Sequence, residues 1–266
     1  MFQNKMVVIT GGTDGIGKAL VEEFLNLGAT VATCSRTEGK LSDLKTEFAG
    51  KPLFTMIADV SKEEDCKNFI EKTLEKYQKI DVLINNAGIS MRALFKDTEL
   101  STLRKVMDIN FWGTVYCTKF ALNSIIENKG TIVGIASIAG HRGLPGRSGY
   151  SASKAAVIRW METLRTELLD TGVNVMWVSP GFTASNTRYA ALGENGEPVR
   201  ESKLDEGKIM TAGECARHIV KAIEKRKRTL VLTFTGKEAI FMNKFFPGLA
   251  DKMIRKLYFK NGKMVK

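Results

Sequence analysis

Histidine, cysteine and proline are scarce in this sequence, and no long apolar run interrupts it. Its 266 residues include two histidines, four cysteines and five prolines. The cysteines form no Cys-x-x-Cys pair, which argues against a structural zinc site and favours a reducing compartment. No apolar stretch reaches the roughly 18 residues needed to cross a bilayer. A strand-like run begins within a few residues of Met1, so we expect no signal peptide. Together, these observations predict a cytoplasmic protein without a metal site.

The sequence is instead rich in short apolar runs that alternate with longer helical patterns. Seven runs predict buried strands that are apolar on both faces: KMVVIT, TVATCS, LFTMI, VLINNAG, GTIVGIAS, NVMWVSP and TLVLT. Segments between them, at 15–28, 61–77, 100–130 and 150–172, repeat apolar residues at helical spacing. This alternation predicts a single α/β domain with a doubly wound parallel sheet of about seven strands and helices on both faces.

A glycine-rich turn lies between the first predicted strand and the first predicted helix. The turn, TGGTDGIG, contains Gly11, Gly15 and Gly17. Glycines allow a tight turn and let the backbone approach a pyrophosphate, to which the helix N-terminus offers unpaired N–H groups. The alternative is a purely structural turn, because three residues separate Gly11 from Gly15, unlike the plain GxGxxG fingerprint. The flanking strand and helix favour a dinucleotide site.

The end of the second predicted strand bears on which dinucleotide would bind. An acidic residue there hydrogen-bonds the adenosine ribose hydroxyls of NAD, whereas an arginine accommodates the 2′-phosphate of NADP. Here the strand ends in Ser35 and Arg36, and the next acid is Glu38. A guanidinium is planar, permanently charged and suited to phosphate. We therefore predict NADP(H), with a solvated arginine and a preference for NAD as the alternatives.

A tyrosine and a lysine lie four residues apart at the start of a later predicted helix. Tyr150 and Lys154, in SGYSASKAAV, share one helix face, which can bring an ammonium near a phenol. A phenol, whose pKa is normally about 10, becomes a useful acid when a nearby cation lowers that pKa. Taken alone, an ordinary solvated helix face explains the pair better, so the pair needs the other motifs beside it.

Together these motifs resemble the short-chain dehydrogenase/reductase family over nearly the whole chain. TGGTDGIG matches the family's TGxxxGxG, NNAG at 85–88 its NNAG, YSASK its YxxxK, and SPG at 179–181 its element after the sixth strand. The resemblance implies a Rossmann-type domain over 1–235. Within it, the polar and glycine-bearing stretch 191–208 is long enough to form a lid, so we expect a substrate lid at about 182–210. The resemblance leaves 236–266 as a basic amphipathic C-terminal extension, and it implies a homo-oligomer.

The resemblance also implies a role for each site residue. Tyr150 would be the acid or base, and Lys154 would lower its pKa and hydrogen-bond the nicotinamide ribose. Ser137 would donate to the substrate oxygen, and Asn110, on the long helix expected after NNAG, would hold a proton-relaying water. The implied cofactor-binding residues are Gly11, Thr13, Asp14, Gly15, Ile16, Gly17, Ser35, Arg36, Asp59, Val60, Asn86, Ala87, Gly88, Tyr150, Lys154, Pro180, Gly181, Thr183 and Ser185.

Two of these positions keep an alternative. Asp59 lies where the family contacts adenine, but Asp59 or Ser61 could equally cap the next helix. The family often has a threonine four residues beyond the glycine of SPG, whereas this chain has Ser185 there. Thr183 offers a second hydroxyl nearby, so either residue could bond the nicotinamide carboxamide.

Three stretches are expected to rim the substrate pocket: Met91 with Arg92, 138–148, and 182–192. Their mixed apolar and basic character suits an apolar carbonyl compound. An anionic group on that compound could meet a basic residue of this rim, although each of these is more often a solvated loop charge. The candidates are Arg92, His141, Arg142 and Arg188.

Positive charge gathers at the C-terminal end of the chain. The whole chain carries a net charge of +11, and residues 221–266 hold thirteen Lys or Arg against three acids, a net +10. Apolar residues interleave with these lysines: Phe241, Phe245, Phe246, Leu249, Met253, Leu257 and Phe259. We favour packing of these residues over the pocket or against a second subunit. The alternative is an anionic membrane surface, and nucleic acid is the least favoured partner because a cofactor already accounts for the strongest motif.

These observations predict an oxidoreductase that transfers a hydride between NADP(H) and a small-molecule carbonyl or secondary alcohol of lipophilic character. Two alternatives stay open. One is an NAD-dependent alcohol dehydrogenase of the same family, and the other is a catalytically idle cofactor-binding scaffold that acts through its basic tail. The joint presence of Asn110, Ser137, Tyr150 and Lys154 argues against the idle scaffold.

Overall fold

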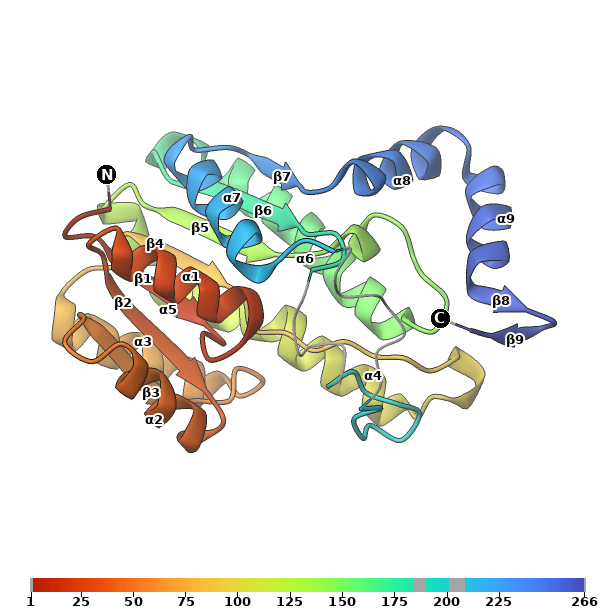
Figure 1. Ribbon diagram of the computed structural model, residues 1–266. Coiled ribbons are helices and arrows are strands. Elements are labelled where there is room, and N and C mark those ends of the chain that lie inside the picture. Colours follow the sequence, from red (N-terminus) through yellow and green to blue (C-terminus); the bar gives the residue numbers. More distant parts are fainter. Residues whose placement is uncertain (1, 184–189, 201–208, 266) are drawn as a thin grey trace.

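A parallel sheet of seven strands lies at the centre of the protein (Figure 1). The computed structural model describes residues 2–183, 190–200 and 209–265. Its sheet has the order β3-β2-β1-β4-β5-β6-β7. The strands are β1 (Met6–Thr10), β2 (Thr30–Ser35), β3 (Leu53–Ile57), β4 (Val82–Asn85), β5 (Thr131–Ile135), β6 (Asn174–Ser179) and β7 (Thr229–Val231). Each falls within one of the seven predicted runs, so the predicted doubly wound fold is confirmed.

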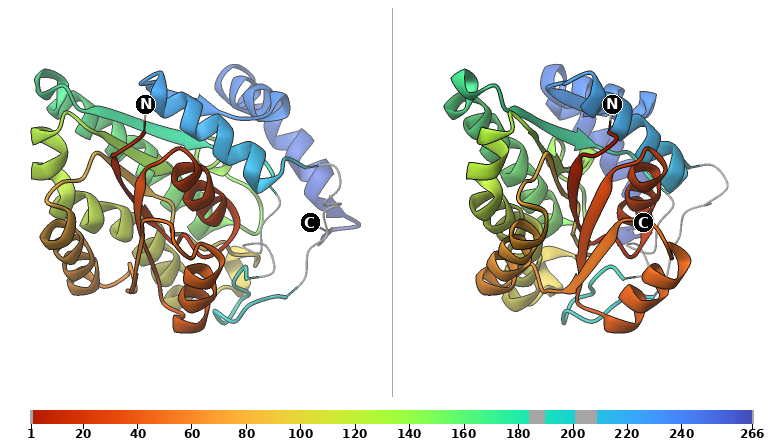
Figure 2. Two further views of the ribbon diagram at one scale, coloured as in Figure 1. Left: turned by 60° about the vertical axis from the view of Figure 1, so that its left-hand side comes forward. Right: turned by 90° about the vertical axis from the view of Figure 1, so that its left-hand side faces the viewer.

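Helices cover both faces of this sheet (Figure 2). Successive side chains of a strand point to opposite faces. Val7 and Ile9 therefore join a core with Phe24 of α1, while Met6 and Val8 join a second core with Phe69 of α3. The first core lies under α1 (Gly15–Asn26), α2 (Glu38–Glu47) and α7 (Ala212–Glu224). The second lies under α3 (Glu63–Tyr77), α5 (Gly113–Glu127) and α6 (Ser148–Glu167).

The two edge strands are less buried than predicted. Ile57 at the end of β3 is 53% exposed, and Thr229 at the start of β7 is exposed. The prediction that all seven strands are buried on both faces is therefore wrong for β3 and β7. An edge strand has a neighbour on one side only, and the helices that cover the centre of the sheet do not enclose its margins.

The last part of the chain leaves the layered domain. After β7 come α8 (Phe234–Phe245), α9 (Pro247–Tyr258) and a short hairpin of β8 (Phe259–Lys260) and β9 (Lys263–Met264). Figure 1 shows α8 continuing outward from β7 and α9 turning away from it. The predicted boundary between residues 235 and 236 falls inside α8. Within the described ranges, no helix has both the length and the apolar character to span a membrane.

Candidate active site

The strand order reverses between β1 and β4, and in open α/β sheets ligands bind beyond the carboxyl ends of the strands at such a point. The turn after β1 and the segment after β4 are joined there by hydrogen bonds. Thr10 Oγ accepts from the backbone N–H groups of Asn86 and Ala87, both at 3.0 Å. Asn86 Nδ2 donates to the carbonyls of Thr10 and Gly11 at 3.0 and 3.1 Å. Asn86 thus holds the two segments in register.

The glycines of the turn lie where the fold has no room for a side chain. Gly11 has φ +69° and Gly15 has φ +52°, in the left-handed region that favours glycine. A Cβ on Gly17 would lie 2.2 Å from the carbonyl oxygen of Gly11 and 2.4 Å from Asn86 Nδ2. The first turn of α1, which includes Ile16, therefore packs directly on the glycine turn. Thr13 and Asp14 come immediately before this helix. Asp14 is the N-cap residue, and its side chain makes no capping hydrogen bond to α1.

Two cationic side chains, Arg36 and Lys40, lie near the end of β2. Arg36 has a side chain 54% exposed, and its Nη1 lies 3.9 Å from Asp59 Oδ2. Lys40 of α2 has its Nζ 3.3 Å from Asp14 Oδ2. Between them, Ser35 Oγ accepts from Thr13 Oγ and from the N–H of Thr37, both at 3.3 Å. Both ion pairs are long and largely solvated, so each cation can take a stronger anionic partner at little cost.

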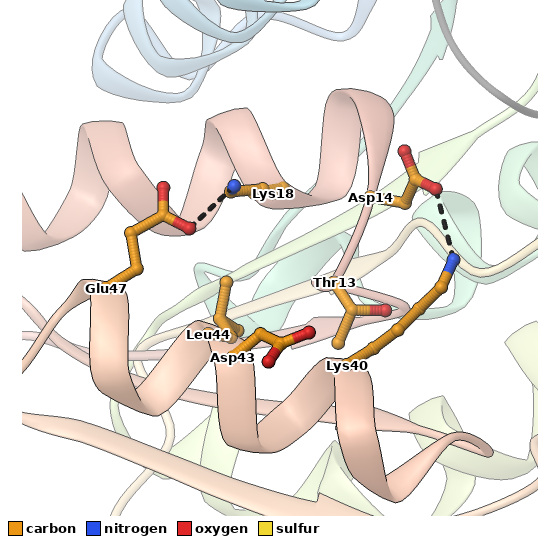
Figure 3. Close-up of a pocket in the computed structure, with 7 residues that line it drawn as sticks. All are labelled: Thr13, Asp14, Lys18, Lys40, Asp43, Leu44 and Glu47. Atoms are coloured by element: carbon orange, nitrogen blue, oxygen red, sulfur yellow. Dashed lines mark hydrogen bonds and ion pairs between the residues drawn. The ribbon is translucent and has the colours of Figure 1, made fainter.

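A cavity of about 300 Å³ opens between the glycine turn and α2 (Figure 3). Its lining is Thr13, Asp14, Lys18, Lys40, Asp43, Leu44 and Glu47. Lys18 is paired with Glu47 at 2.7 Å, and Lys40 with Asp14. Acids outnumber bases in this lining, so the cavity itself does not favour an anion. A phosphate at this end would depend on Arg36 and Lys40.

Asp59 holds a local turn and does not cap a helix. Its Oδ1 accepts from the backbone N–H of Ser61 at 3.0 Å and from Ser61 Oγ at 2.8 Å. The N-cap residue of α3 is Lys62, so the alternative that Asp59 or Ser61 caps this helix is wrong. The neighbouring Val60 is buried against Gly113, where a Cβ would come within 2.9 Å of it.

Tyr150 and Lys154 lie together on the first turns of α6. Lys154 is 4% exposed, its Nζ donates to the Ile135 carbonyl at 2.7 Å, and it lies 5.9 Å from the centre of the Tyr150 ring. Gly88 fits between two polar groups, because a Cβ there would lie 3.2 Å from Lys154 Nζ and 3.0 Å from Asn110 Oδ1. The segment after β4, the end of β5 and the start of α6 thus converge on the Lys154 ammonium.

Asn110 does not lie on one long helix as predicted. The segment 100–130 consists of α4 (Leu100–Met107), a π-helical turn (Asp108–Trp112) and α5, with Asn110 at the centre of the turn. Its Oδ1 accepts from the Ile89 N–H at 2.8 Å, and its Nδ2 donates to the Ile89 carbonyl at 3.0 Å and to Ser153 Oγ at 2.9 Å. Such turns are frequent at functional sites. Here it aims the amide at the segment after β4.

Ser137 follows β5 directly and caps a short 3₁₀ turn, Ile138–Gly140. Its Oγ accepts from the Ala139 N–H at 3.2 Å. Gly140 packs on α6, since a Cβ there would lie 2.8 Å from the Lys154 backbone carbonyl. The turn that carries Ser137 is therefore fixed against the helix that carries Tyr150 and Lys154.

Burial lowers the pKa of Lys154 from its ordinary value of 10.5 to about 8, because the site disfavours the charged ammonium. Below pH 8 both the folded and the unfolded chain hold this proton, and folding must bury the charge. Between pH 8 and 10.5 only the unfolded chain holds it, so the free energy of unfolding rises with pH in that range. The gap between the two pKa values corresponds to roughly 3 kcal/mol.

We expect Lys154→Met to remove this rise in cofactor-free protein. Denaturant titrations at pH 7.5 and 10 would measure the free energy of unfolding of wild type and variant. The wild type is expected to gain roughly 2–3 kcal/mol relative to Lys154→Met over that interval. Lys119→Met, at an exposed lysine of α5, should give a curve parallel to wild type. A constant difference between wild type and Lys154→Met would contradict the perturbed pKa.

An apolar cluster surrounds Tyr150 on the side away from the glycine turn. Met91, Val106 and Leu192 are buried, and Ile89, Leu103 and Tyr150 pack against them. Met91 is fully buried within this cluster, so its predicted place on the pocket rim is wrong. Leu192 donates to the Ser90 carbonyl at 2.9 Å and accepts from the Arg92 N–H at 2.7 Å. The described part of the expected lid, 190–200, is thus joined to the segment after β4.

Two of the predicted basic rim residues, His141 and Arg142, have partners within the fold. His141 Nε2 lies 2.9 Å from Ser179 Oγ, and burial lowers the His141 pKa. Arg142 bonds Asn243 of α8 at 3.1 Å and pairs with Asp251 of α9. His141 and Arg142 therefore join the C-terminal helices to the domain. Arg188 lies outside the described residues.

The segment after β6 contains the remaining predicted cofactor residues. Pro180 is buried, and Gly181 packs on Thr233, whose Oγ would lie 2.7 Å from a Cβ at residue 181. Thr183 is 8% exposed and its Oγ donates to the Gly181 carbonyl at 3.3 Å. Ser185 lies outside the described residues, so the choice between Thr183 and Ser185 stays a prediction.

Sequence reasoning missed three residues that shape this site. Thr10 accepts two N–H groups from the segment after β4, Ser153 holds Asn110, and Lys40 adds a second cation near Arg36. Ser153 lies inside the YxxxK motif and Thr10 immediately before the glycine turn, so position in a motif was the available signal. Lys40 lies on α2, a helix that was not predicted from the sequence, so no motif pointed to this residue.

Comparisons with known proteins agree with this geometry. A family model described as short chain dehydrogenase matches residues 5–194. The chain is 34% identical over 264 residues to 11-beta-hydroxysteroid dehydrogenase A of Arachis hypogaea, across 96% of this chain and 75% of that protein. A solved short-chain dehydrogenase from Streptomyces avermitilis has a TM-score of 0.81 and 25% identity over 96% of this chain and 97% of its own. The structure of ElxO with NADP bound has a TM-score of 0.75 and 28% identity over 86% of this chain and 97% of its own.

Proposed function

This chain belongs to the short-chain dehydrogenase/reductase family, and on that premise we propose that it is an NADP(H)-dependent reductase of lipophilic ketones. Membership makes it an oxidoreductase that transfers a hydride between a nicotinamide cofactor and an alcohol or ketone. The assignment as a ketone reductase rests most on one observation: the buried Lys154 ammonium lies beside the Tyr150 ring and next to the segment after β4. The choice of NADP(H) over NAD(H) rests on Arg36 at the end of β2.

The residues present fit a nicotinamide dinucleotide. Gly11 and Gly17 let the glycine turn, the segment after β4 and the first turn of α1 pack more closely than a Cβ would allow, so that α1 begins directly at the turn. Asn86 and Ala87 brace the strand ends on either side through Thr10. When bound, NADP(H) supplies or accepts the hydride at C4 of its nicotinamide ring. Pro180, Gly181 and Thr183 would bound the nicotinamide end, and Ser35, Arg36, Asp59 and Val60 the adenosine end.

The chain's own groups manage the proton. Tyr150 would give its phenolic proton to the oxygen of a ketone that is becoming an alkoxide, or take it back in the reverse direction. Lys154 stabilises the phenolate, and its lowered pKa of about 8 leaves it mostly cationic at pH 7. Ser137 would donate to the same oxygen. Asn110 acts as a positioning residue, because its amide fixes Ile89 and lies beside Gly88 next to the ammonium.

The apolar cluster beside Tyr150 suits a lipophilic substrate and would form the wall of its pocket. Met91, Leu103 and Leu192 pack with Tyr150, so a carbonyl presented to the phenol would contact mostly apolar side chains. The name of the Arachis hypogaea relative specifies a hydroxysteroid as its substrate. By analogy, a ketone on a rigid apolar skeleton is the substrate class to screen first. Assembly into a homo-oligomer stays an expectation from the family.

Cofactor titration tests this proposal before any substrate is known. Nicotinamide fluorescence of purified protein would be followed with NADPH and, separately, with NADH. We expect NADPH to bind at least roughly tenfold more tightly, because a charge-assisted hydrogen bond contributes about 1.5–3 kcal/mol. Tighter binding of NADH would overturn the assignment of NADP(H). Binding of neither would overturn the cofactor assignment altogether and leave the basic tail as the better guide to function.

A further inference from the structure

The C-terminal helices are fixed to the loop that carries Ser137. Asn243 of α8 donates to the His141 carbonyl at 3.0 Å and accepts from Arg142 at 3.1 Å. At the far end, Met264 of the hairpin meets Gly146, where a Cβ would lie 2.7 Å from the methionine sulfur. The inner side of α8–β9 therefore lies along 141–146, the segment that leads into α6 and Tyr150.

The outer side of the same helices is apolar and open. Exposed apolar residues on α8, the bend and α9 are Phe234 (76%), Phe241 (54%), Phe245 (55%), Phe246 (52%), Leu249 (51%), Met253 (55%) and Leu257 (53%). On α8 the spacing of seven and four residues puts Phe234, Phe241 and Phe245 on one face. On α9, Leu249, Met253 and Leu257 recur every four residues, while Ala250 and Tyr258 face inward and are buried. We call this surface the outer face.

Aromatic rings gather where α8 meets α9. The ring centres of Phe241 and Phe245 are 4.8 Å apart, and those of Phe241 and Phe246 are 6.4 Å apart. Lys244 Nζ lies 5.3 Å from the centre of the Phe245 ring. Of the seven tail residues expected to pack over the pocket or a second subunit, only Phe259 is partly covered within this chain. The other six are left at the surface.

Positive charge borders the apolar stripes. Residues 234–265 contain seven Lys or Arg and two acids, a net charge of +5. On α9, Lys252 and Lys256 each precede an exposed apolar residue, Met253 and Leu257, and so flank that stripe. Asp251, one of the two acids, is paired with Arg142 on the inner side. The charge presented outward is therefore almost entirely positive.

The exposed apolar residues and the positive charge beside them together favour one class of partner. Contact between two copies through this face would bring two net charges of +5 together, which opposes association. Nucleic acid would satisfy the lysines but leave the seven exposed apolar side chains without a partner. The interface of an anionic bilayer satisfies both, because head groups neutralise the lysines while aromatic and aliphatic side chains enter the acyl boundary.

We propose that the outer face of α8 and α9 docks on an anionic lipid surface. Docking places the 141–146 segment, and with it the approach to Tyr150 and Ser137, beside the membrane. A lipophilic substrate can then pass from the bilayer into the apolar wall of Met91 and Leu192 without crossing water. The proposal rests on exposure and charge alone and holds for either nicotinamide cofactor.

Vesicle sedimentation tests this proposal on the full chain. Wild type is expected to pellet with vesicles that contain phosphatidylglycerol and not with vesicles of phosphatidylcholine alone. At 1 M salt, where the Debye length is about 3 Å, binding should fall strongly. Phe245→Ser/Leu249→Ser and Lys252→Glu/Lys256→Glu should each weaken binding by roughly tenfold or more.

Matched variants separate the outer face from general effects. Leu27→Ser/Leu169→Ser removes two exposed leucines elsewhere, and Lys45→Glu/Lys51→Glu makes the same charge change on and just after α2. Both should bind vesicles as wild type does. NADPH titration of every variant checks folding, and a failure of the proposed cofactor preference would appear there and not in sedimentation.

Three results would overturn the proposal. One is no preference for phosphatidylglycerol in wild type. A second is an equal loss of binding in the outer-face variants and their controls. The third is a dimer that Phe245→Ser/Leu249→Ser converts to a monomer in analytical ultracentrifugation without any vesicle binding, which would make the outer face an interface between copies of this chain.

Discussion

Tyr150→Phe is expected to lower kcat by roughly a thousandfold or more and to leave the NADPH affinity nearly unchanged. The substitution removes one oxygen atom and keeps the ring that packs against Met91 and Leu192. The alkoxide formed from a ketone then lacks the acid that protonates it. Stopped-flow or steady-state oxidation of NADPH with a ketone that wild type reduces would give kcat, and nicotinamide fluorescence would give the affinity.

Tyr116→Phe serves as the matched control for this experiment. Tyr116 lies on α5, where its ring stacks on Trp112 at 5.7 Å between ring centres, away from the Lys154 ammonium. Its removal of a phenolic oxygen should leave kcat within about twofold of wild type, as expected for a surface substitution. A Tyr150→Phe protein with kcat within tenfold of wild type would show that another group supplies the proton.

The sheet and the central tyrosine–lysine pair could be predicted because each depends on neighbouring residues. A run such as MVVIT is apolar at every position, which suits a strand covered on both faces. Tyr150 and Lys154 meet because a helix places residues four apart on one face. The capping box of α7, from Thr211 to Glu214, is also a local pattern, so the start of this helix is predictable from neighbouring residues.

Other features depend on contacts between distant segments. The π-helical turn at 108–112 is held by Asn110 bonding Ile89, 21 residues earlier, and no local pattern encodes that. Lys154 finds the Ile135 carbonyl only once α6 packs on β5. Helix α2 has just two buried residues, Leu41 and Leu44, so its apolar pattern is too thin to predict a helix. Lys40 on that helix was missed for the same reason.

The C-terminal extension also combines features set by neighbouring residues with features set by distant contacts. Its basic amphipathic character was readable from sequence, but its inner contacts were not. Arg142 reaches Asn243 and Asp251 across about a hundred residues of chain, and this pairing decides which side of α8–α9 faces outward. Sequence therefore predicted the kind of surface, and the fold supplied its orientation toward the active site.

Arg36→Asp is expected to weaken NADPH binding by roughly a hundredfold and to leave NADH binding equal or stronger. The guanidinium lies beside Ser35 at the end of β2 and is only loosely paired with Asp59, so a 2′-phosphate can replace that partner. An aspartate would repel the phosphate but accept hydrogen bonds from the ribose hydroxyls of NADH. Fluorescence titrations with both nucleotides would measure the change, and an equal loss for the two would refute the role of Arg36.

Two further variants test whether this reversal of cofactor preference is specific to Arg36. Arg217→Asp applies the same charge change at an arginine of α7 that is 61% exposed and paired with Glu23, and it should leave both affinities unchanged. Lys40→Met removes the second cation and its ion pair with Asp14, and it should weaken NADPH binding by roughly threefold to tenfold, less than Arg36→Asp, because a solvated lysine acts as a screened point charge. If Lys40→Met had the larger effect, the 2′-phosphate would be held mainly from α2, and discrimination between NADP(H) and NAD(H) would depend on a helix rather than on the end of β2.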